Sequence, residues 1–160
     1  MKKNLISQPK VLLTCSLALS LMPNAVQAQS ISCFQNLNFG SIVACPATAD
    51  TVRLAPTGGT TAGGCSSAGG SPLRGRCLLQ GQFSPVRVMQ VTIAAATVAI
   101  TNGTSNMNMT NFDWNTTAGG PTTTVTAFIT TVDLGATLNV KAAQPGGTYI
   151  GSFTVTVNYQ

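Results

Sequence analysis

Apolar and polar residues alternate in short runs along most of the chain, and Gly, Pro and Asn residues separate the runs. The clearest run is the last one, in which Phe153, Val155, Val157 and Tyr159 occupy every second position. Alternation with a period of two is typical of a β-strand with one apolar face. No segment of useful length has the period of an amphipathic helix, so the pattern predicts an all-β protein.

The remaining runs predict about eight strands in total, at a spacing typical of a sandwich or barrel. Asn102 and Gly103 separate two alternating runs and tolerate positive φ, which predicts a hairpin with a two-residue type I′ turn. Since alternation leaves one face of each sheet apolar, two sheets must cover each other, and we expect an immunoglobulin-like antiparallel β-sandwich. The predicted strands include residues 37–43, 51–55, 76–83, 87–93, 97–101, 106–112, 124–130, 136–140 and 148–159, with a long loop at 57–72.

The first 28 residues differ from the rest of the chain. A basic start without acidic residues precedes a short, mostly apolar run at residues 11–22, and small residues at Val26 and Ala28 follow. These are the three parts of a secretory signal peptide, and the apolar run is too short to span a membrane. We expect cleavage after Ala28, which would leave one domain at residues 29–160 and no transmembrane segment.

Four cysteines remain after the expected cleavage, and an even number in an exported chain indicates two disulfides. Three pairings are possible, and we favour the one that is local in sequence, in which each bond closes a short loop worth about 3 kcal/mol. Zinc is the rival interpretation, but the chain has no histidine and no CxxC motif, in which two residues separate a pair of cysteines. The expected pairs are Cys33–Cys45 and Cys65–Cys77.

Charged residues are few. The whole chain has a formal net charge of +5, but the residues after the expected cleavage site carry five basic and three acidic side chains, net +2. Dispersed cations of this kind do not indicate a nucleic-acid partner. The absence of His and Glu excludes the usual nucleophilic triads and zinc sites, so we expect a protein that is not an enzyme and needs no cofactor or metal.

Trp114 is the only tryptophan and the one aromatic side chain with two opposed interpretations. An exposed tryptophan can stack on a sugar ring, which would suit a carbohydrate-binding protein. A buried one would fill the end of a sandwich core. The sequence leaves both interpretations open.

Three stretches resemble a known family. VAITNGTSNMNMTNF at residues 98–112 and the C-terminal LGATLNVKAAQPGGTYIGSFTVTVNYQ at 134–160 resemble the bacterial domain-of-unknown-function family numbered 4402, and LNFGSIV at 37–43 resembles its opening strand. Its members are similar to spore coat protein U and to subunits of chaperone–usher pili. The resemblance implies a sandwich that lacks one strand and leaves an apolar groove beside its last strand.

The resemblance also implies how such a protein assembles. Pilin subunits of this kind end on a strand, with an aromatic penultimate residue and a glycine fourteen places from the end, here Tyr159 and Gly147. A periplasmic chaperone lends the missing strand, and the N-terminal extension of another pilin-like subunit later replaces it. The residues implied in this strand pairing are Gly147, Phe153, Val155, Val157, Tyr159 and Gln160.

A donor segment should itself be free and alternating. The expected mature start offers only Ile31 and Phe34 as donor residues; they are three positions apart, and Cys33 lies between them. We expect a secreted structural protein, a fimbria- or pilus-like subunit that passes through the periplasm and an outer-membrane usher to the cell surface. The alternative is a self-complete monomeric sandwich with a carbohydrate-binding or adhesive function.

Overall fold

The described part of the protein consists of β-strands and loops without a helix. The structure, a computed structural model, describes residues 29–83, 85–116 and 120–160, so the predicted signal peptide lies outside the described residues. The strands are β1 (Ser30–Gln35), β2 (Ser41–Val43), β3 (Asp50–Leu54), β4 (Thr60–Ala62), β5 (Ser67–Gly69), β6 (Gly75–Gln80), β7 (Val88–Ile93), β8 (Val98–Thr101), β9 (Asn106–Trp114), β10 (Thr122–Thr126), β11 (Ile129–Val140), β12 (Gly147–Thr148) and β13 (Val155–Tyr159).

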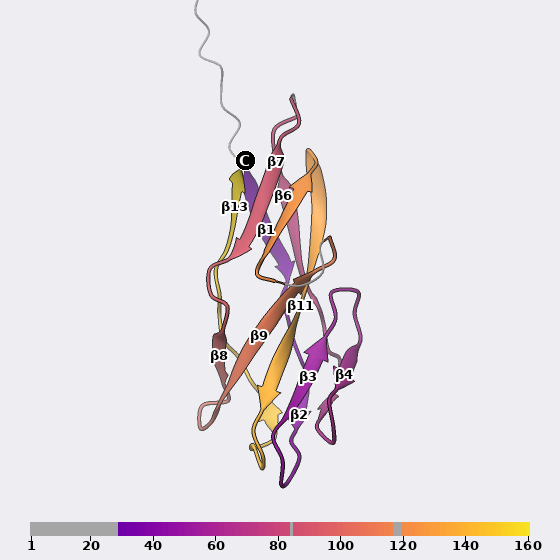
Figure 1. The fold of residues 1–160 in the computed structure, drawn as a ribbon, viewed down its shortest axis with the longest axis vertical. Helices are drawn as coiled ribbons and strands as arrows, with labels where there is room; N and C mark the ends of the chain where they lie inside the picture. The colour runs from indigo at the N-terminus through magenta and orange to yellow at the C-terminus, as the bar shows by residue number, and fades with distance from the viewer. Residues whose placement is uncertain (1–28, 84, 117–119) are drawn as a thin grey trace, which may run out of the picture.

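These strands pair in an antiparallel manner and form three sheets (Figure 1). The largest sheet has the order β1-β6-β11-β3-β4, with β9 also paired to β11 and β8 paired to β9. The second sheet has the order β10-β7-β13, and a small third sheet has the order β12-β2-β5. The prediction of an all-β antiparallel sandwich is therefore confirmed, although the described residues form thirteen strands where about eight were expected.

Strand β11 organises the largest sheet because it pairs with three other strands. Its first half pairs with β6, its second half pairs with β3 along the same edge, and β9 pairs with its opposite edge. Gly135 lies where the partner changes from β6 to β3. A Cβ atom at Gly135 would lie 2.3 Å from the carbonyl oxygen of Leu54 and 2.7 Å from Pro56, so the close approach of these strands requires glycine.

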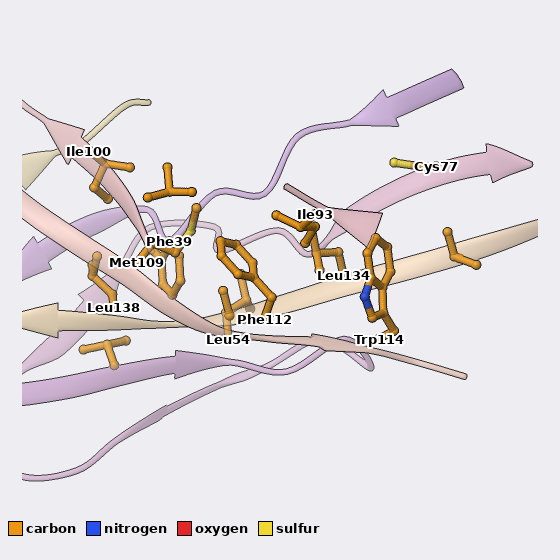
Figure 2. Packing of buried hydrophobic residues seen from close by; sticks show 14 of the residues in the cluster. Phe39, Leu54, Cys77, Ile93, Ile100, Met109, Phe112, Trp114, Leu134 and Leu138 are labelled. Carbon is orange, nitrogen blue, oxygen red and sulfur yellow. The ribbon is translucent and has the colours of Figure 1, made fainter. Parts of the chain in front are cut away.

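The core lies between the largest sheet and the second sheet. Every second residue of β7 is buried, and β9 follows the same pattern over most of its length, which is why alternation in the sequence predicts both strands. Phe112 and Trp114 of β9 are the largest fully buried side chains. Figure 2 shows them in one cluster with Leu54, Ile93 and Leu134, which belong to three other strands.

The hairpin predicted at Asn102 is present, but its turn differs from the prediction. Thr101 pairs with Asn106, so β8 and β9 are joined by a four-residue loop and not by a two-residue type I′ turn. Only Gly103 has positive φ there, at 92°. The side-chain oxygen of Asn102 instead accepts hydrogen bonds from the N–H groups of Thr104 and Ser105, which stabilises the longer loop.

Three other predicted segments are divided differently in the structure. The loop expected at 57–72 contains β4 and β5, and the strand expected at 124–130 is interrupted between β10 and β11. The strand expected at 148–159 is also divided, because the chain changes sheets within it. Ile150 pairs with Thr101 at the end of β8, in the largest sheet, whereas β13 joins the second sheet.

Candidate functional site

The last strand, β13, lies at the edge of the second sheet and pairs with β7. The N–H of Gln160 donates a hydrogen bond to the carbonyl of Val88 at the start of β7, with an N···O distance of 3.0 Å. Since peptide groups alternate in direction along an antiparallel ladder, those of Val155 and Val157 face the opposite edge of β13. Among the described residues, no strand pairs with that opposite edge.

The first described strand, β1, lies at the edge of the largest sheet and pairs with β6. Cys33 faces Cys77 of β6 directly across this ladder, and the two residues form a disulfide. Ile31 is half-buried against the core, whereas the ring of Phe34 is exposed and lies 5.6 Å from the guanidinium carbon of Arg76. β1 is thus a paired and covalently held strand, which counts against the predicted donor role of Ile31 and Phe34.

Strands β1 and β13 contact each other where the two sheets meet, but no ladder joins them. Figure 1 shows them side by side near the C-terminus. Gln29, which directly precedes β1, donates a side-chain hydrogen bond to the carbonyl oxygen of Val157, with an N···O distance of 3.3 Å. This bond independently places the Val157 carbonyl on the edge of β13 that faces away from β7.

A groove of about 500 Å³ separates the two terminal segments beyond this contact, and we call it the terminal groove. Cys33 and residues 35–39 form one wall, and residues 148–153 with Val155 form the other. Its floor includes the core side chains of Ile100, Met109 and Leu134. None of the described residues that line the groove carries a charge. The lining combines an apolar floor with uncharged polar side chains, which are those of Gln35, Asn36, Asn38, Thr148, Tyr149 and Ser152.

The unpaired edge of β13 and the apolar floor of the terminal groove together restrict which ligands can bind there. An unpaired strand edge offers backbone N–H and C=O groups and is a template for another strand. An extended peptide can pair with that edge while every second side chain enters an apolar groove. A small apolar ligand also fits a cavity of this volume but would leave the strand edge unpaired.

The C-terminal residues predicted for strand pairing lie on one side of their segment. Phe153, Val155, Val157 and Tyr159 are all half-buried and contact the core. Phe153 and Val155 line the terminal groove, whereas Val157 and Tyr159 do not. The guanidinium carbon of Arg87 lies 5.9 Å from the centre of the Tyr159 ring. The structure therefore brings two of the four side chains to the groove.

Gly147 lies at the opposite end of the groove from Val157. It belongs to β12, where it pairs with Ile42 of β2, and its φ of 137° favours glycine. Its neighbour Thr148 lines the groove. Gly147 thus lies directly before the first residue of the C-terminal wall, Thr148, and does not itself line the groove.

Trp114 is not available to a ligand, so the prediction that it stacks on a sugar is wrong. Its side chain is 2% exposed and belongs to the core, and Figure 2 shows it beside Ile93 and Leu134. The inward-facing residues of β9 are Met107 and Met109 and, after an irregularity at Asn111, Phe112 and Trp114, so Trp114 falls on the same side as Phe112. The second sequence interpretation, a core tryptophan, is the one that the fold realises.

All four predicted cysteines form disulfides, but the favoured pairing is wrong. The bonds are Cys33–Cys77 and Cys45–Cys65, with sequence separations of 44 and 20 residues. The local pairing fails because β1 aligns with β6, which lies far along the chain, and so places Cys33 opposite Cys77. Sequence spacing alone cannot reveal that alignment.

A second hollow, of about 300 Å³, lies near the start of β3, and two of its polar side chains, Asn139 and Asp50, already have partners. The amide of Asn139 donates to the carbonyl of Asn108 and to the hydroxyl of Thr110. The carboxylate of Asp50 accepts hydrogen bonds from the backbone N–H groups of Thr51 and Ser66, and these bonds, that from Ser66 foremost, lower its pKa. We therefore take the terminal groove as the candidate site.

The sequence did not reveal the groove floor or the contact made by Gln29. Leu37 and Phe39 alternate in the predicted strand at 37–43, and this alternation was the available signal for part of one wall. Ile100 and Met109 of the floor belong to the predicted hairpin, but Leu134 joins them only because β11 pairs with β9, which no local pattern indicates.

Comparison with known proteins identifies one family. A family model described as Domain of unknown function (DUF4402) matches residues 30–159, a range that includes every strand described above. No curated protein and no solved structure matches the chain. Within the described ranges, the structure contains no helix suited in length and apolarity to crossing a membrane, and no cluster of three potential metal-ligating side chains.

Proposed function

The chain belongs to the family described as Domain of unknown function (DUF4402), and from its terminal groove we propose that it is a structural subunit of a fimbria- or pilus-like surface appendage. The subunit acts by accepting a β-strand from a partner protein. The partners are a periplasmic chaperone, an outer-membrane usher and neighbouring subunits. The subunit is exported to the cell surface and has a structural rather than an enzymatic role.

One observation carries this proposal: two edge strands of different sheets, β1 and β13, flank an uncharged apolar groove. Exposed strand edges promote uncontrolled pairing, and natural proteins normally cover them. Exposed apolar surface likewise marks a contact with another molecule. A partner strand covers the edge and the apolar floor together, which makes strand addition the binding mode that fits best.

Two further features agree with export. Both cysteine pairs are disulfide-bonded, and disulfides persist in oxidising compartments such as the bacterial periplasm. The sequence also begins with the pattern of a secretory signal peptide. These features support the location that we propose.

The proposal can be tested with a peptide that mimics a donor strand. The full-length chain is expressed in a bacterium with an oxidising periplasm, and the exported protein is purified. A ten-residue peptide of alternating valine and threonine, with two lysines added for solubility, is then titrated against it. We expect the peptide to bind and to raise the melting temperature, because a ligand that binds the folded state stabilises it.

A matched pair of variants locates the binding site. Ile150 lines the groove and is 71% exposed, so Ile150→Ser removes apolar contact area without opening the core. Burial of an isoleucine side chain is worth about 1.5–3 kcal/mol, so we expect roughly tenfold or more weaker binding. Val43 is 58% exposed and lies outside the groove lining, so Val43→Ser should bind like the original protein. A stable monomer that binds no strand peptide would instead support the self-complete adhesive domain.

A further inference from the structure

The two disulfides described above are alike in burial. In each bond one cysteine is exposed, Cys33 or Cys65, and its partner is buried, with Cys77 3% and Cys45 2% exposed. A thiolate breaks a disulfide by attacking one sulfur while the other sulfur leaves as a thiolate, and the rate depends on access to the attacked sulfur. In both bonds the exposed cysteine is therefore the one attacked and the buried cysteine is the leaving group. Burial alone would give the two bonds similar rates.

A carboxylate beside the second bond separates the two. The Oδ2 atom of Asp50 lies 3.6 Å from the Sγ atom of Cys45. Hydrogen bonds from backbone N–H groups, that of Ser66 foremost, lower the pKa of Asp50, so this carboxylate is ionised at neutral pH. Attack on Cys65 would place a second negative charge on Cys45, and like charges this close repel each other. The Ser66 hydroxyl, which donates to the same sulfur at 3.5 Å, offsets only part of that repulsion.

The first bond is reached through the terminal groove. Cys33 comes two positions after Ile31, which packs against the core, so both side chains point to the same side of β1. Cys33 is nevertheless exposed, because the groove opens over that side, and both Cys33 and Cys77 line it. None of the described residues that line the groove carries a charge, so none opposes the thiolate that Cys77 would become.

From these observations we infer that the terminal groove gives thiols access to the Cys33–Cys77 disulfide, and that a strand bound in the groove closes this access. The second part of the inference rests on the function proposed above. A strand that fills the groove covers Cys33, because Cys33 is part of the lining. The reaction partner is an exported oxidoreductase with a reduced pair of cysteines. It distinguishes a subunit whose groove is empty from one that has received its partner strand.

The exchange proceeds in two steps. A thiolate of the oxidoreductase attacks the Sγ atom of Cys33, the bond between the two sulfurs breaks, and Cys77 leaves as a thiolate that takes a proton from water. The second thiol of the oxidoreductase, as its thiolate, then attacks its own sulfur in the mixed disulfide and releases Cys33. The subunit gains two electrons and two protons, and the cysteine pair of the oxidoreductase becomes a disulfide. β1 then remains paired to β6 without its covalent link.

The rates of reduction test the access. The exported protein is treated with 2-mercaptoethanol, samples are quenched in acid, and the free thiols are alkylated and located by mass spectrometry. We expect Cys33–Cys77 to open about threefold to fivefold faster than Cys45–Cys65, from the repulsion of two unit charges about 4 Å apart. Cysteamine carries a positive charge that Asp50 attracts, so with this thiol the difference should narrow.

Two carboxylate variants locate the cause. Asp50→Asn removes the charge but keeps the shape of the side chain, and it should speed the opening of Cys45–Cys65 by about the same threefold to fivefold. It should leave the rate of Cys33–Cys77 unchanged. Asp113→Asn is the control, since Asp113 pairs with Arg53 and neither residue lines the groove, and it should change neither rate.

A bound strand should then protect only the first bond. The ten-residue peptide of valine and threonine is added at about ten times its Kd, and the rate of Cys33–Cys77 should fall about tenfold, because only unoccupied protein reacts. The rate of Cys45–Cys65 should not change. Ile150→Ser removes apolar contact area from the groove, so the same peptide concentration should protect this variant less.

The outcomes separate the two proposals. If both disulfides of the original protein open at the same rate, or Cys45–Cys65 opens faster, access through the groove is refuted and the strand-accepting function is unaffected. If the peptide raises the melting temperature but does not slow the opening of Cys33–Cys77, closure by the strand is refuted and the strand-accepting function stands. If the peptide does not bind, the proposed function fails and closure fails with it, whereas access through the groove is still decided by the measured rates.

Discussion

The disulfide between Cys33 and Cys77 should stabilise the protein more than the one between Cys45 and Cys65. The first bond closes a loop between residues separated by 44 positions, and the second between residues separated by 20. On the chain-entropy model these loops correspond to about 4 and about 3 kcal/mol of stabilisation. A domain of this size is stable by about 5–15 kcal/mol, so either loss is a large fraction of the total.

The perturbation is the paired change Cys33→Ala with Cys77→Ala. Alanine is chosen because Cys77 is buried, and a serine there would leave a buried hydroxyl. Urea unfolding can be followed through the fluorescence of the single tryptophan, which the core buries. With a denaturant slope of about 2 kcal/mol per molar, the midpoint should fall by about 2 M. The matched control, Cys45→Ala with Cys65→Ala, should lower it by about 1.5 M.

Hydrogen exchange gives the sharper comparison, because the two bonds constrain different segments. β1 is held by one ladder, to β6, and by the Cys33–Cys77 bond. Its amides should therefore lose protection in the first double variant and keep it in the second. The reasoning is refuted if β1 stays protected in the first variant, or if a non-reduced digest of the original protein links Cys33 to Cys45.

Two further predictions follow from the core and from the loop that contains Asp50. Trp114→Ala should cost about 3–5 kcal/mol in urea unfolding because it empties a buried site; a variant of unchanged stability would show that Trp114 is not a core residue. The lowered pKa of Asp50 means that its ionised form is favoured in the folded state, so its contribution to stability is present above the ordinary pKa of 3.8 and lost as pH falls through its lower folded value. Asp50→Asn should therefore weaken the fall in unfolding free energy between about pH 5 and pH 2, and an unchanged pH profile would contradict the assignment.

The sequence by itself determined the class of the fold and most of its strands. Alternation with a period of two can be recognised from residues only two positions apart. The local sequence of β7 or β9 is therefore enough to predict which face of the strand is buried. The cysteine content likewise indicated two disulfides, and the C-terminal alternation correctly placed Phe153 and Val155 on one side of the chain.

Only the tertiary structure decided which strands pair, and the site depends on that. Cys33 meets Cys77 because β1 aligns with β6, and the C-terminal segment, predicted as one strand at 148–159, changes sheets between Ile150 and Val155. The terminal groove is the space between the two terminal segments, because β1 and β13 pair with other strands and not with each other. Its position is set by contacts between residues as far apart as Gln29 and Val157, and no local pattern encodes such contacts.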